Sequence, residues 1–218
     1  MDWTDKIFQE KTFSSVYSKS RKVCSSRVNL WGALLTFVVL SACLAMSFWS
    51  GTFWMSFPSI IIAVRAIGEV GLTVTTQLLG FLIAGFAIFA SITKPEIFVL
   101  LANLPHKKSD ITRLQFIFFN FLFVFIHFIL FLALSVFIKV GLPPGGPFSN
   151  LFKWLAAAHQ SILYLAAGLC LCFMSAWLVF ILMLLKSFIW NMYQSILLAI
   201  AADAELRGRA QLSRPESK

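Results

Sequence analysis

The sequence has few charged residues, and long parts of it have none. Only 12% of its 218 residues are Asp, Glu, Lys or Arg. Four stretches have no charge at all: 28–64, 70–93, 114–138 and 154–185. About 20 mainly apolar residues let a helix cross a bilayer, and the helix satisfies its own backbone polar groups there. The mean hydropathy of +0.85 agrees, so a soluble enzyme is excluded as the overall class.

We therefore predict an all-α, polytopic membrane protein with four transmembrane helices. Proline is missing from 59–93 and from 149–205, so the second and fourth helices should extend beyond the bilayer. The predicted organisation is an N-terminal tail at 1–28, a membrane domain at 29–187, an extension of the fourth helix at 188–206 and a disordered tail at 207–218. Within the membrane domain, the spans are expected at about 29–49, 70–93, 114–138 and 155–185.

Acidic residues are half as common as basic ones, which gives a net charge of +9. Fifteen of the 18 Lys and Arg residues fall in the two tails and in the loop at 94–113. The other three are Arg65, Lys139 and Lys153. Because basic residues accumulate on the cytoplasmic face, both termini are predicted to be cytoplasmic. Nucleic-acid binding is the weaker explanation of the basic excess, since a membrane protein needs these charges for orientation.

The N-terminal tail lacks the features of a cleavable signal peptide. Trp3, Ile7 and Phe8 have helical spacing, which predicts a short amphipathic helix at the membrane surface or on a partner protein. The basic segment 18–27 should lie near anionic lipid head groups.

Catalytic motifs are also missing, and no carboxylate lies near the centre of a span. The four cysteines do not suggest a disulfide set: Cys24 is predicted to be cytoplasmic, and Cys43, Cys170 and Cys172 lie within spans. They are expected to be apolar packing residues, with no metal and no cofactor. We therefore expect a protein that is not an enzyme.

Polar residues within or next to the spans form two small sets. Asn120 and His127 are seven residues apart on one helix face, where hydrogen bonding to another helix is favoured over a proton or ion pathway. Arg65 and Glu69 are four residues apart at the outer end of the second span. They are predicted to form an outer ion pair at head-group level, with an external vestibule as the alternative.

The extension of the fourth helix is apolar although it continues past the last span. Large side chains recur there at helical spacing, and those chosen as the interface are Ile189, Met192, Tyr193, Ile196 and Ile200. Such a face needs cover in water. Either another copy of the chain or the short apolar helix predicted at 95–104 could provide it.

A small, basic, four-span chain with both tails inside resembles, in architecture, the membrane subunit of the Kiwa anti-phage system. That resemblance implies a homo-oligomeric sensor in a bacterial inner membrane, with a cytoplasmic protein partner and a role in antiviral defence. Our leading functional hypothesis is a non-enzymatic, oligomeric sensor or scaffold that recruits a cytoplasmic partner, because catalytic motifs are missing, the extension of the fourth helix is apolar and the inner face is basic. The alternative is an ion-conducting pore or depolarising effector, for which the candidate polar residues are Gln77, Asn120, His127 and Ser135.

Overall fold

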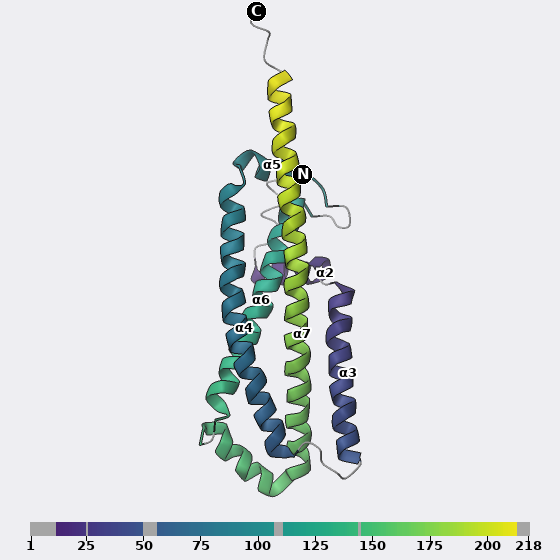
Figure 1. Ribbon diagram of the computed structural model, residues 1–218, viewed down its shortest axis with the longest axis vertical. Helices are drawn as coiled ribbons and strands as arrows, with labels where there is room; N and C mark the ends of the chain where they lie inside the picture. Colours follow the sequence, from purple (N-terminus) through teal and green to yellow (C-terminus); the bar gives the residue numbers. More distant parts are fainter. Residues whose placement is uncertain (1–11, 25, 50–55, 107–110, 144, 213–218) are drawn as a thin grey trace, which may run out of the picture. The chain divides into compact units, whose positions relative to one another are not determined.

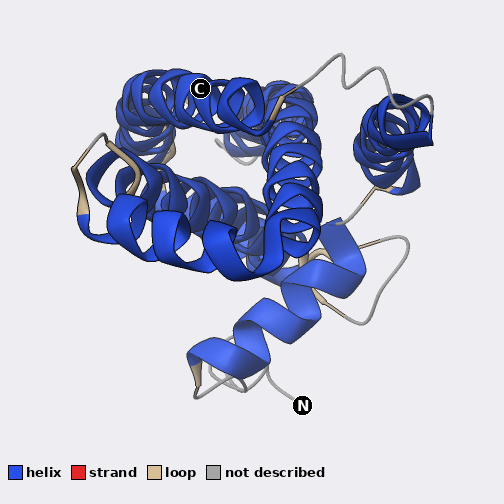
Figure 2. Cartoon of the chain, turned by 90° about the horizontal axis from the view of Figure 1, so that it is seen from below, coloured by secondary structure: helices blue, strands red, loops and turns tan. Residues whose placement is uncertain are grey.

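The computed structural model describes residues 12–24, 26–49, 56–106, 111–143 and 145–212. The described residues form helices and short connections, and the only strand-like pairing among them is an isolated antiparallel bridge between Pro105 and Thr112 (Figure 2). The helices in Figure 1 are α2 (Phe13–Cys24), α3 (Arg27–Trp49), α4 (Phe57–Ile92), α5 (Pro95–Asn103), α6 (Arg113–Gly141) and α7 (Pro147–Leu212).

Four of these helices are long and apolar enough to cross a membrane, which confirms the predicted fold class. They are α3, α4, α6 and, in α7, the part from Ser161 to Glu205. With 36 residues, α4 is about 54 Å long, and with 66 residues α7 is about 99 Å long, whereas the hydrocarbon core measures about 30 Å. Both helices therefore extend beyond a bilayer, as expected.

Local sequence features explain where α4, α5 and α6 begin. Ser56 accepts a hydrogen bond from the Ser59 backbone N–H at 3.4 Å, just before α4. Pro95 occupies the first turn of α5, where its missing N–H costs nothing. The start of α6 has a reciprocal cap: Thr112 N–H donates to Gln115 Oε1 at 2.9 Å, and Gln115 N–H donates to Thr112 Oγ1 at 3.2 Å.

Both ends of the described chain contain helical residues beyond those predicted. The helix predicted around Trp3 and Ile7 lies outside the described residues, whereas α2 follows it in a segment predicted only to be basic. At the other end, α7 continues to Leu212, so the predicted disordered tail begins too early at residue 207. A salt bridge between Arg207 and Asp203, one turn apart, supports this last part of the helix.

The chain divides into two compact units, and α4, α6 and α7 each contribute to both. Unit 1 comprises Met1–Ser25, Phe81–Phe125 and Leu185–Lys218, and unit 2 comprises Ser26–Gly80 and Ile126–Leu184.

Glycines allow the helices of unit 2 to approach one another closely. Gly71 of α4 faces Phe131 and Ser135 of α6 so closely that no side chain fits there without a shift. Gly168 of α7 faces Leu44 of α3. Otherwise α3 is the least buried of the long helices.

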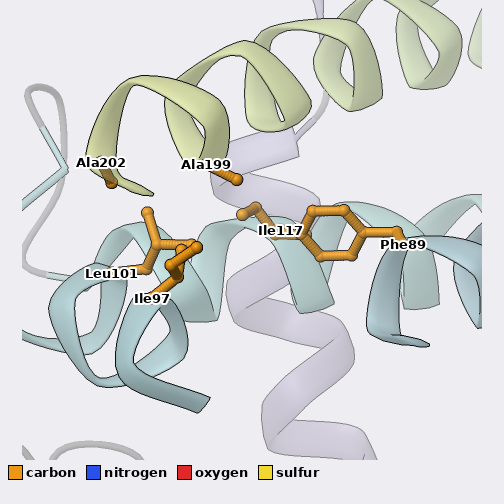
Figure 3. Packing of buried hydrophobic residues seen from close by; sticks show 6 residues of the cluster. All are labelled: Phe89, Ile97, Leu101, Ile117, Ala199 and Ala202. Carbon is orange, nitrogen blue, oxygen red and sulfur yellow. The ribbon is translucent and has the colours of Figure 1, made fainter. Parts of the chain in front are cut away.

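Unit 1 has its own apolar core, built from four helices (Figure 3). Its buried members are Phe89 of α4, Ile97 and Leu101 of α5, Ile117 of α6, and Ala199 and Ala202 of α7. Next to this core, Tyr17 of α2 stacks on Phe123 of α6 with ring centroids 6.1 Å apart. The predicted short apolar helix at 95–104 is therefore real, since it corresponds to α5, and it forms part of a packed core.

Candidate functional site

One face of α7 within unit 1 is buried against the other helices of that unit. Phe188, Ser195, Ala199 and Ala202 are all at most 9% exposed. Ala199 and Ala202 lie over Ile97 and Leu101 of α5 (Figure 3), and their small side chains allow a close approach of the two helices. The chain's own α5 therefore covers one side of the apolar extension.

The opposite face of the same segment is open. Ile189, Tyr193 and Ile200 are 50%, 51% and 62% exposed, and all three belong to the predicted interface. Trp190 and Leu197 beside them are also exposed, and the rings of Trp190 and Tyr193 lie 5.8 Å apart. We call these five residues the α7 stripe.

The other two residues of the predicted interface have a different role. Met192 and Ile196 are partly buried and pack against the core of unit 1. A partner protein would therefore meet Ile189, Tyr193 and Ile200, whereas Met192 and Ile196 contribute to the stability of the unit itself.

An ion cluster fastens the α4–α5 junction to α7 in unit 1. Lys94 Nζ lies 2.7 Å from Asp203 Oδ1, and the Arg207 guanidinium lies 2.7 Å from Asp203 Oδ2. The hydrogen bond from Lys94 is the main cause of a lowered pKa at Asp203; partial burial opposes the shift and Arg207 reinforces it. Asp203 lies near the end of the apolar part of α7 and follows the span predicted at 155–185 by several turns, so the sequence prediction puts this cluster outside the membrane.

The two polar residues predicted within the third span are on α6, but they belong to different units. Asn120 is 4% exposed in unit 1. His127 lies in unit 2, where its ring meets the edge of Phe180 on α7 at a centroid distance of 5.3 Å.

The outer ion pair forms with a different partner from the predicted one. Glu69 Oε1 lies 3.4 Å from Lys139 Nζ at the end of α6, and among the described residues it forms no salt bridge with Arg65. Arg65 Nε is buried and has no hydrogen-bond partner in the described part of the chain. Spacing along one helix predicted the wrong cation, because the last turn of α6 brings Lys139 to Glu69.

The hydroxyl groups of Thr75 on α4 and Ser135 on α6 are buried in unit 2. Both residues are 0% exposed, and the described residues offer neither oxygen a hydrogen bond. By contrast, the hydroxyls of Thr76 and Ser91 on α4 donate to the carbonyl one turn earlier. Gln77, by contrast, is exposed, so the pore candidates Gln77 and Ser135 do not share one environment.

Among the described residues, no three His, Cys, Asp or Glu side chains lie close enough together to hold a metal ion.

No family model, curated protein or solved structure matches the chain. Its function is therefore inferred from the surfaces, charges and buried polar groups described above.

Proposed function

We propose that the protein is a non-enzymatic, oligomeric membrane protein that senses or scaffolds and recruits a cytoplasmic protein partner. In this proposal it lies in a bacterial inner membrane with both termini in the cytoplasm, and anti-phage defence is its setting. The observation that carries the proposal is the α7 stripe, a row of large apolar side chains on a helix whose other face is already packed.

The stripe is large enough to hold a second protein surface. Complete burial of one large apolar side chain contributes about 1.5–3 kcal/mol. Ile189, Tyr193 and Ile200 are each about half exposed, so each has roughly 1 kcal/mol still to gain on burial. Trp190 and Leu197 extend the same surface, and together the five support either self-association or capture of a partner.

Polar substitutions in the stripe test this proposal. The double variant Tyr193→Asn with Ile200→Asn should insert into the membrane normally but form smaller assemblies, measured by light scattering on size exclusion in detergent. Val99→Asn on α5 is the matched control, because Val99 is an exposed apolar residue of the same unit and lies outside the stripe. An unchanged mass and unchanged partner capture for the double variant would show that the stripe only contacts lipid.

The membrane orientation needs a separate experiment. In a cysteine-free background, cysteines introduced at Gly145 and Ser217 should react with an impermeant maleimide from opposite sides of the membrane. Labelling of position 217 from outside intact cells would refute cytoplasmic termini.

The unpartnered hydroxyls of Thr75 and Ser135 favour a second candidate, an ion-conducting pore. Such groups can coordinate water or ions when several copies assemble. Planar-bilayer recordings decide between the two: steady currents that disappear in Thr75→Val with Ser135→Ala would establish the pore, and silent membranes from well-assembled protein would exclude it.

A further inference from the structure

The connection between α5 and α6 holds two basic side chains next to each other. The backbone N–H of His106 donates to the backbone carbonyl of Ile111 at 2.9 Å, and the backbone N–H of Arg113 donates to the backbone carbonyl of Leu104 at 2.9 Å. With the bridge between Pro105 and Thr112, these bonds form a short antiparallel clamp. His106 and Arg113 are thereby brought to the same end of unit 1.

The clamp and α7 enclose a hollow of about 490 Å³, within the range of small-ligand sites. We call it the Arg113 hollow. It is lined by His106, Arg113, Phe116, Ile117, Asn191, Gln194, Ser195, Leu197 and Leu198. One part of the lining is cationic or amide-bearing and the rest is apolar, which suits an amphipathic molecule.

The guanidinium of Arg113 has no counter-charge among the described residues that line the hollow. Arg113 is partly buried, and its guanidinium forms no salt bridge within the described chain. No acidic side chain is among the described residues of the lining. The His106 ring is stacked on the Phe116 ring with ring centroids 4.3 Å apart, and this contact orients the His106 ring. A partly buried guanidinium and the amide groups of Asn191 and Gln194 line one hollow, and donors of these kinds bind phosphate groups.

The position of Arg113 in the chain points to the source of that phosphate. The uncharged stretch of α6 starts at Leu114, directly after Arg113. If α6 crosses the membrane, Arg113 is at the bilayer surface, where phospholipid phosphates are. Leu197, exposed beside the hollow, offers apolar surface to an acyl chain.

We propose that the Arg113 hollow binds a phosphate group, supplied by a phospholipid of the surrounding bilayer. Arg113 provides the charge and two parallel donors, Asn191 and Gln194 provide amide donors from α7, and Ile117, Leu197 and Leu198 contact the apolar part of the lipid. This site shares Leu197 with the edge of the α7 stripe, but it needs membrane insertion and not the proposed recruitment of a partner.

Native mass spectrometry of the full-length protein in a nonionic detergent tests the site. The probes are dihexanoyl phosphatidic acid, dihexanoylglycerol, which has the same tails without phosphate, and inorganic phosphate. Wild type is compared with Arg113→Gln and with Lys186→Gln, which removes an exposed cation of the same unit outside the hollow. We expect phosphatidic acid to bind, dihexanoylglycerol not to bind, and Arg113→Gln to weaken binding about tenfold. Lys186→Gln should change the affinity less than twofold.

Each result decides a specific point. If inorganic phosphate binds as tightly as phosphatidic acid, and Arg113→Gln weakens both, the site stands but its source is a soluble phosphate compound. If Arg113→Gln and Lys186→Gln weaken lipid binding equally, the attraction is general surface charge and the proposal fails. It also fails if Arg113→Gln has no effect. Should Arg113→Gln not fold, Gln194→Ala, at an exposed position, carries the same comparison.

Discussion

Replacing Gly71 by alanine should destabilise the contact between α4 and α6 in unit 2. A Cβ atom at this position would lie 2.6 Å from Phe131 Cε1 and 2.6 Å from Ser135 Oγ, where ordinary contacts are 3.4–4 Å. The Ser135 hydroxyl can rotate away. The Phe131 ring cannot, because it is fully buried and packs against the Trp177 ring with ring centroids 5.7 Å apart. Overpacking of this kind costs about 1–3 kcal/mol.

Gly80 on the same helix provides the matched control. A Cβ there meets nothing within 4 Å, so Gly80→Ala brings only the helix-propensity gain, roughly 0.5–1 kcal/mol. Both glycines lie inside α4, so the propensity gain is common to both variants, and they should differ by the overpacking cost of about 1–3 kcal/mol. In a chain of this length that corresponds to roughly 2–12 °C in thermal midpoint, measured by size exclusion after heating in one detergent.

A compensating variant makes the test specific. Gly71→Ala with Phe131→Leu relieves the clash, and it should lose less stability than the two single changes added together. Equal midpoints for Gly71→Ala and Gly80→Ala would refute the close approach of α4 and α6. Strict additivity in the double variant would assign the loss to something other than the Phe131 ring.

Three further predictions concern packing and charge. Leu101→Ala should cost about 2–5 kcal/mol because the side chain is fully buried, whereas Val99→Ala, at an exposed position of the same helix, should change the thermal midpoint little. Asp203→Asn should destabilise unit 1 at neutral pH. The folded pKa of Asp203 is lowered from 3.8, so the difference in stability between this variant and wild type should shrink as the pH falls below 3.8 and through the lowered value. Thermal midpoints at pH 7 and pH 3 measure this difference. Glu69→Gln should cost at most about 1 kcal/mol, because its salt bridge with Lys139 is exposed; a larger loss of assembly on size exclusion would give this pair a functional role.

The long helices could be predicted from the sequence because their signals are local. The absence of proline and charge over 20 or more residues is sufficient for α4 and α7, and Pro95 marks the start of α5. The predicted start of the third span at residue 114 is one residue from the start of α6 at Arg113. The cap of this helix is Thr112, which forms a reciprocal pair with Gln115 three residues later, a spacing that is recognisable in the sequence.

Partners on other helices could not be predicted in the same way. The extension of α7 is apolar on most sides, so its periodicity does not tell which face packs. Large side chains gave the strongest signal, yet the buried face is built from Ser195, Ala199 and Ala202, whose small size makes them inconspicuous. Likewise, the pairing of Glu69 with Lys139 depends on the register between α4 and α6, and residue spacing within one helix gives no information about that register.

The core of unit 1 also imposes an order in time on the synthesis of the chain. Lys94, at the start of α5, bonds to Asp203, which is 109 residues later. At 5–20 residues per second, translation takes about 5–20 s to make the intervening chain. During that interval Ile97 and Leu101 can pack against Phe89 and Ile117 but not yet against Ala199 and Ala202. The core of unit 1 is therefore completed only when the last tenth of the chain is being made.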